Sequence, residues 1–277
     1  MNKKRLFAGI AAVATAFTMC FALSACNNDG KEKPVGDNSV NSGETWIKAF
    51  EDSVASTNYK LAQKMTVTGK SYNEADESVD AVRTTSMEVS YDGVGLKAHA
   101  ITESKIQIGK DNPKQNATEI FLEVSGSNFV EYNYNITEND SWYAYADEYV
   151  TENEAKEVLE TRMKNSGLDS LTAIQFKGTG DNEKVTGTLA ELYSLFDYNS
   201  QTQVYSATLI SSDSYSQFEM TLQIAFKDGK LYKVINDYVQ GEGDGAITCH
   251  AEVTITYGGV SVTIPQEAKD ALEDEEE

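Results

Sequence analysis

The strongest constraint on the fold is a strict alternation of apolar and polar residues in several long segments. In residues 218–226 the apolar side chains occupy alternate positions, and Glu219, Thr221 and Gln223 stand between them. Residues 59–67 and 247–257 follow the same rule. A period of two puts successive side chains on opposite faces of a strand, and one apolar and one polar face is typical of antiparallel sheet. Tight turn sequences separate many such segments, so we expect a meander of about eleven strands.

Three amphipathic helices are predicted among the strands. Ser42 can cap the first, whose apolar residues share one face through position 54. The other two begin at capping boxes, Thr151-x-x-Glu154 and Thr188-x-x-Glu191, each followed by an apolar stripe. We therefore predict one α+β domain: a single curled antiparallel sheet, a half-barrel, with three helices packed on its concave apolar face.

The chain begins with the features of an export signal. Three basic residues precede an uncharged apolar run over residues 6–22, and Leu23-Ser24-Ala25-Cys26 follows. This ending resembles the lipobox of bacterial lipoproteins, in which the Cys thiol receives diacylglycerol and a peptidase cuts before it. The resemblance implies acylation of Cys26 and an extracytoplasmic domain anchored to the cell membrane. The alternatives are an uncleaved membrane anchor, for which the run is short against a core of ~30 Å, and an ordinary cleaved signal.

These features divide the chain into four parts. Residues 1–25 are the expected signal peptide, and residues 26–43 combine the acylated Cys26 with a polar, flexible tether. The folded domain is expected over residues 44–272. The acidic residues 273–277 form a tail that should remain solvated.

Acidic residues outnumber basic ones. Cleavage before Cys26 would leave 20 basic side chains against 44 acidic ones, a net charge of about −24. Nucleic-acid binding is excluded as a function, because it requires a basic footprint. The negative charge either binds cations or a basic partner, or keeps the protein soluble, and the second interpretation is favoured.

Catalytic and metal-binding motifs are lacking. Once Cys20 is removed with the signal and Cys26 is acylated, Cys249 has no disulfide partner. Cys249 and His250 are strand neighbours and should point to opposite faces, so they cannot form a dyad. His99 is the only other histidine, which disfavours zinc. The acidic loop 241–245 is interpreted as a turn rather than a calcium site. We expect no enzymatic activity, metal or cofactor.

One aromatic cluster is the best candidate for a binding site. Its members can line an amphipathic pocket or stack on sugars, although such residues also suit half-exposed sheet positions. They are Tyr132, Tyr134, Trp142, Tyr143, Tyr145 and Tyr149.

The order of elements carries a wider resemblance. A lipobox, a tether, an opening helix and a meander with a helical insertion precede the closing segment Tyr257-Gly-Gly-Val-Ser-Val-Thr-Ile-Pro265. This order is similar to that of the LolA/LppX-like lipoproteins and lipoprotein carriers. The resemblance implies a half-barrel over about residues 44–268, with lipid held between sheet and helices in several members, and it carries over no catalytic residue.

Two functions follow as expectations. The first is a lipid-anchored, monomeric envelope protein that binds a lipid or other hydrophobic ligand between sheet and helices. The alternative is a surface interaction module for an envelope protein or polysaccharide, without a cavity. A hydrolase ranks last, because no nucleophile or base can be named.

Overall fold

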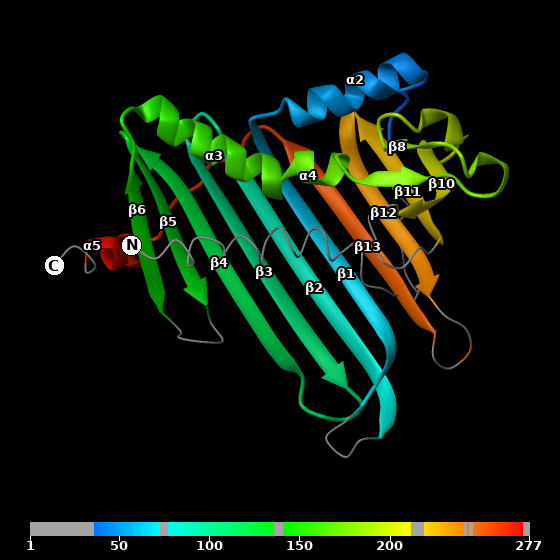
Figure 1. Ribbon diagram of the computed structural model, residues 1–277, viewed down its shortest axis with the longest axis horizontal. Coiled ribbons are helices and arrows are strands. Elements are labelled where there is room, and N and C mark those ends of the chain that lie inside the picture. The colour runs from blue at the N-terminus through cyan, green and yellow to red at the C-terminus, as the bar shows by residue number, and fades with distance from the viewer. Residues whose placement is uncertain are drawn as a thin grey trace.

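The computed structural model describes residues 36–72, 77–135, 141–211, 219–240, 243 and 246–273. The predicted signal peptide, Cys26, most of the loop 241–245 and residues 274–277 lie outside this part of the chain. Over the described residues the protein is α+β, with one open, curled antiparallel sheet, as predicted (Figure 1).

The sheet contains thirteen strands rather than about eleven. Along the sheet their order is β6-β5-β4-β3-β2-β1-β13-β12-β11-β10-β7-β8, and β9 pairs with β10. Strands β7, β8 and β9 have three residues each, which is too short for an alternation to be recognised. The strands are β1 (Asn58–Tyr72), β2 (Ser78–Asp92), β3 (Lys97–Ile108), β4 (Lys114–Ser125), β5 (Asn128–Asn135), β6 (Trp142–Glu148), β7 (Gln175–Lys177), β8 (Thr186–Thr188), β9 (Asp197–Asn199), β10 (Val204–Ser211), β11 (Glu219–Lys227), β12 (Lys230–Gln240) and β13 (Ile247–Tyr257).

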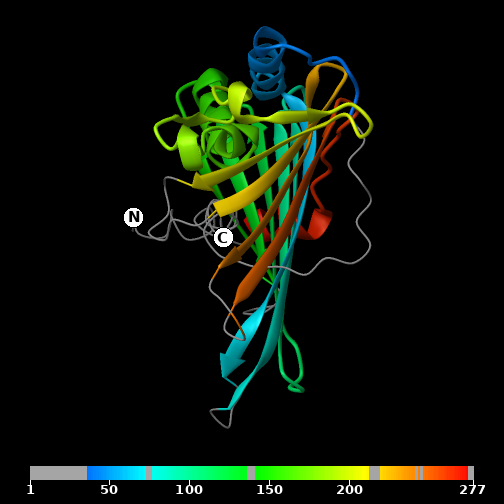
Figure 2. The same cartoon turned by 90° about the vertical axis from the view of Figure 1, so that its right-hand side faces the viewer.

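Helices α2 (Gly43–Val54), α3 (Glu152–Ser166) and α4 (Leu168–Thr172) cover one face of the sheet, here named the inner face (Figures 1 and 2). Ser42 caps α2 and Thr151 caps α3, each in a capping box, so both predicted helix starts are confirmed. No helix among the described residues is both long and apolar enough to cross a membrane.

The predicted third helix at Thr188–Glu191 is wrong. The Glu191 carboxylate accepts hydrogen bonds from the Thr188 amide and hydroxyl, but the backbone continues as a turn and a short 3₁₀ helix over Tyr193–Leu195. The indole of Trp46 donates to the carbonyl oxygen of Leu189 at 3.0 Å. The apolar side chains of this segment are therefore buried by a turn that Trp46 supports, rather than by a helix.

The core lies along the inner face. Pairing places Leu61, Val89, Ala100 and Ile120 in one row across β1 to β4, and equivalent rows continue across β13 to β10. Most of these apolar side chains are buried in one continuous cluster with residues of the three helices. Burial of a common apolar face explains why the alternation in the sequence is so strict.

The opposite, outer face carries a second, smaller core. After β13, the chain crosses this face and forms α5 (Gln266–Glu273) against β5 and β6 (Figure 2). Val262, Ile264 and Ala268 pack there on Phe121 and Tyr132. The closing apolar segment therefore packs on the outer face, and a helix we had not predicted occupies the face that we expected to be free of helices.

Residues 36–40, which we expected to belong to the tether, dock on the turn between β11 and β12. The Asp37 amide donates to the carbonyl oxygen of Phe226 at 2.8 Å, and the Asp37 carboxylate accepts from the Asp228 amide at 2.6 Å. The hydroxyl of Tyr205 donates to the carbonyl oxygen of Val40, whose side chain is 1% exposed. We call residues 36–40 the clip.

Candidate functional site

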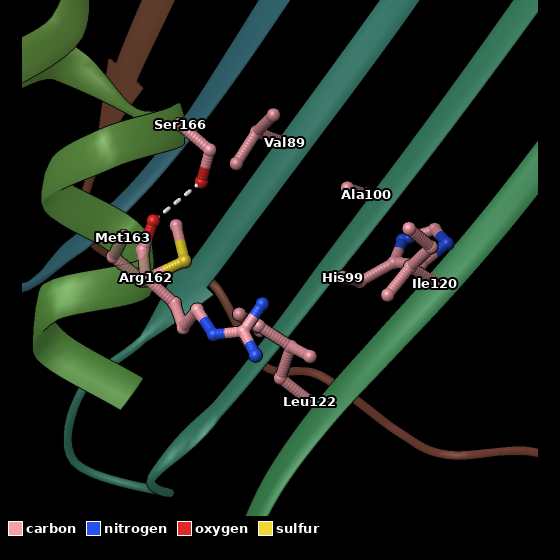
Figure 3. A pocket seen from close by; sticks show the side chains of 9 residues that line it. Val89, His99, Ala100, Ile120, Leu122, Arg162, Met163 and Ser166 are labelled. Carbon is pink, nitrogen blue, oxygen red and sulfur yellow. Dashed lines mark hydrogen bonds between the residues drawn. The ribbon is translucent and has the colours of Figure 1, made fainter. Parts of the chain in front are cut away.

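The inner face beneath α3 was the predicted ligand space, and it is almost filled. Val89, Ile120 and Leu122 from the sheet and Arg162 and Met163 from α3 surround a cavity of about 20 Å³ (Figure 3). A cavity of this size holds about one water molecule, whereas sites for drug-sized ligands measure roughly 300–1,000 Å³. With α3 in this position, the cavity that these residues enclose is too small for a lipid chain.

A buried polar cluster lies beside this cavity. Glu131 on β5 is 2% exposed, and its Oε2 lies 3.7 Å from Nη1 of Arg162 on α3. The hydroxyl of Tyr145 also hydrogen-bonds to the Glu131 carboxylate. Burial raises the pKa of Tyr145, and the negative charge of Glu131 raises it further. The Arg162 guanidinium stands 5.6 Å from the ring centre of Phe129, so one arginine links α3 to the sheet through charge and an aromatic face.

Several buried polar atoms on the inner face lack hydrogen-bond partners. Among the described residues they include Glu131 Oε2, Asn133 Nδ2, Thr85 Oγ1 and both amide atoms of Asn236. Asn133 is 4% exposed and lies two residues from Glu131 on the same face of β5. A buried polar group without a partner costs about 1–3 kcal/mol, so these atoms mark where an added group would gain most from binding.

The six predicted aromatic residues do not form one site. Tyr132, Tyr134 and Trp142 belong to the outer face, where Trp142 stacks on Tyr134 and packs with the α5 cluster. Burial, with the nearby Glu123 carboxylate, raises the pKa of Tyr132 to about 12. Tyr143 and Tyr145 alternate with Trp142 and Ala144 and point to the inner face, where Tyr149 packs against the main core.

An open groove of about 430 Å³ crosses β1 to β4. Pairing places its walls in two outer-face rows, and the row between them forms the floor. Its centre lies six to eight residues from the strand ends at Asn58 and Lys97. One wall consists of Lys64, Ser86, Glu103 and Ala117, and the other of Thr66, Thr84, Lys105 and Gln115. We call this feature the outer groove.

The sequence did not indicate the outer groove. Its residues come from four strands and are polar members of ordinary alternating segments, so each reads as a solvent-facing position. Only the strand register, which aligns Lys64 with Ser86 and Glu103, brings them together. The Ser86 hydroxyl lies 3.3 Å from the Glu103 carboxylate.

The free cysteine lies on the inner face of the sheet and the two histidines lie on the outer face. Cys249 is fully buried on the inner face, while His250 on the outer face lies 2.9 Å from Asp237, so the predicted placement of these two side chains on opposite faces is confirmed. His99 is only partly exposed, because it stacks on Phe121 and lies 2.7 Å from Glu119. Within the described residues no three acidic, histidine or cysteine side chains are grouped as a metal site would require.

No protein-family model matches the chain, and neither does any curated protein.

Proposed function

We propose that this chain is a lipid-anchored extracytoplasmic protein that acts without catalysis, as a surface interaction module that binds a partner at the outer groove. The observation that supports this proposal is the contrast between two volumes. The outer groove offers about 430 Å³, whereas the space under α3 offers about 20 Å³. Of these two spaces, only the outer groove falls in the range of binding sites.

The chemistry of the groove favours a protein partner. Lys64 and Lys105 carry positive charge, Glu103 carries negative charge, and most of the other lining residues carry hydroxyl or amide groups. Alternating charges and hydrogen-bonding groups give specificity for a complementary polar surface. Among the residues that the structure describes, no aromatic side chain lines the groove, so a polysaccharide would find no ring there on which to stack.

A photocrosslinking experiment in the bacterial host tests this function. A crosslinking amino acid at Ser86, in the groove, should capture a defined protein, and Lys64→Glu with Lys105→Glu should abolish the adduct. The matched control, Lys156→Glu with Lys164→Glu on α3, makes the same change in charge and should leave the adduct intact. A carbohydrate adduct that glycosidases remove would point to polysaccharide instead, and no adduct at Ser86 would contradict the proposal.

The anchor is tested separately. Growth with an alkyne-labelled fatty acid should label the chain, and Cys26→Ala should abolish both the label and membrane fractionation. Cys249→Ala provides the control, because Cys249 is buried and should not affect labelling. An unlabelled chain that still fractionates with membranes would point to an uncleaved apolar anchor.

A hydrophobic ligand under α3 remains the second candidate. Asn133 Nδ2, which has no hydrogen-bond partner, lies next to the apolar cavity and favours it, because a ligand with a polar head could satisfy this atom once α3 moves away. Organic extraction and mass spectrometry of protein purified from its host should then recover a stoichiometric lipid. Protein that repeatedly yields none would exclude this candidate.

A further inference from the structure

The clip fixes where the folded domain is held. Gly36 packs so closely on the β10–β11 side of the sheet that a Cβ atom there would lie 2.4 Å from the carbonyl oxygen of Gln203. The amide of Gly229 donates to the Ser39 hydroxyl at 3.0 Å. The N-terminal side of the domain therefore leaves the sheet beside the turn Asp228–Gly229.

That turn belongs to one end of the sheet. Because the strands are antiparallel, the connections at residues 93–96, 126–127 and 149–151 lie at the same end (Figure 1). We call this the turn end. The far end, where β1 ends and β2 begins, is separated from it by the length of these strands, about 50 Å for fifteen residues, and Lys114 at the start of β4 lies about 40 Å from the turn end, the length of twelve residues.

The chain between the proposed anchor and the clip is short. Ten residue steps separate Cys26 from Gly36, and even a fully extended chain of that length reaches only about 33–36 Å. This reach is less than the length of the sheet. A domain tethered in this way can touch the bilayer with its turn end but cannot turn its far end toward it.

The surface of the turn end suits a lipid interface. Val94 and Val150 are 88% and 90% exposed, more than any other large apolar side chain in the described residues. A groove of about 390 Å³ at the same end is lined by Lys227, Lys230 and Tyr257, among others. Lysine and tyrosine combine an apolar body with a polar tip, which is the chemistry that membrane interfaces favour.

We propose that the turn end faces the bilayer to which the chain is anchored, with Val94 and Val150 at the headgroup level. The proposed occupant of this surface is a phospholipid bilayer. The inference rests on the proposed acylation of Cys26. The outer groove lies six to eight residues along the strands from the turn end, about 20–26 Å away, and would be held off the bilayer where a partner can reach it.

Fluorescence quenching by headgroup-nitroxide lipid in phosphatidylcholine vesicles tests the orientation. Single cysteines replace Val94 or Val150 at the turn end, Ser86 in the groove and Lys114 at the opposite end of β4, and each is labelled with the same fluorophore. The buried Cys249 should not react. In the acylated protein, labels at 94 and 150 should lose most of their fluorescence, whereas labels at 86 and 114 should match protein without vesicles. Quenching of the label at 114 would overturn the proposal. Quenching of the label at 86 would also overturn it, because the domain would then lie flat with its outer face on the bilayer.

A second arm separates orientation from acylation. A hexahistidine segment replaces Cys26 and holds the same variants on nickel-chelating vesicles, so the tether keeps its length without any acyl group. If the native chain fails to float with vesicles, the proposed anchor is wrong. The second arm still decides the orientation, since the same pattern of quenching is expected there and its reversal would reject the inference alone.

Discussion

Trp46 shows how much one side chain can determine. It is fully buried, and its indole nitrogen donates to the carbonyl oxygen of Leu189, far away in the sequence. The aromatic rings with centres 5.0–5.5 Å from Trp46 are Phe50, Tyr193, Phe196, Tyr205 and Phe226. Trp46 thus joins α2, the 3₁₀ segment and two strands at one point.

Replacing this side chain should be costly. Trp46→Ala is expected to lower the free energy of unfolding by about 3–5 kcal/mol, because it leaves a cavity and removes the hydrogen bond to Leu189. Ile47, the next residue, is 46% exposed, and Ile47→Ala should change stability by no more than about 0.5 kcal/mol. Urea unfolding followed by circular dichroism measures both. Equal losses for the two variants would contradict this account.

Buried tyrosines make the fold sensitive to alkali. Burial raises the pKa of Tyr205 and of Tyr257 to about 12, above the value of about 10 for an unfolded chain. A pKa raised on folding adds stability that is complete below pH ~10 and is lost as pH rises toward 12. The urea concentration at the midpoint of unfolding should therefore decrease as the pH is raised from 10 to 12. Tyr205→Phe should weaken this dependence on pH. A midpoint unchanged over this range would show that these hydroxyls ionise without unfolding.

Replacing Arg162 alone is predicted to lower the free energy of unfolding more than replacing Glu131 and Arg162 together. Arg162→Met leaves the Glu131 carboxylate buried without a counter-charge, which typically costs about 3–5 kcal/mol. Adding Glu131→Gln should restore most of that loss, because the neutral amide can still bond to Tyr145. A double-mutant cycle by urea unfolding measures the coupling, and strictly additive losses would argue against a functional pair.

At the scale of elements, local signals decided what could be predicted. The start of α2 was correct because Ser42 is a favourable N-cap residue, and the start of α3 because a capping box fixes a helix start within four residues. The same signal failed at Thr188–Glu191, since the fold uses the Leu189 carbonyl for Trp46. The long strands were predicted from their two-residue period. β7, β8 and β9 were missed because three residues cannot show a period.

Helix α5 was missed for a different reason. Its apolar residues are Ala268, Ala271 and Leu272, a stripe too short to predict a helix at the end of the expected domain. Its helix is stabilised by the outer-face cluster with Phe121, Tyr132 and Trp142, which no local pattern reveals. The aromatic cluster was therefore noticed correctly as a concentration of residues, but its division between two faces depends on tertiary structure.

The packing of α5 leads to a fluorescence prediction. Ala268→Arg should displace α5 and expose Trp142, because the larger charged side chain cannot occupy the fully buried site. Iodide quenching reports the change cleanly, since Trp46 remains fully buried and unquenched. Asp270→Arg, on the exposed side of the same helix, is the control and should leave quenching unchanged. If Trp142 is no more accessible in Ala268→Arg than in the control, α5 does not cover it.

For the whole molecule, the clip determines how far the domain can move. Asp37→Ala with Ser39→Ala and Val40→Asp should release it and extend the reach from Cys26 to Gly43, about 56–61 Å. Labels at Lys114 should then gain lipid quenching, unlike those in the control Asn41→Ala.

Burial opposes the ionised form of Asp37, but hydrogen bonds from Ser39 and the Asp228 amide lower its pKa overall. The clip should therefore hold above pH ~4 and weaken below it. Unchanged quenching in the triple variant would mean that other contacts fix the orientation.

The arrangement of the central strands also governs when folding can finish. β1, near the start of the described chain, pairs with β13, near its end, and the clip docks on a hairpin formed by β11 and β12. Contacts between such distant segments slow folding, because a long loop must close before they form. The first half of the chain cannot complete its core alone. If the polypeptide is exported as proposed, slow folding would keep it unfolded, and therefore able to cross the membrane, until the last strand has passed through.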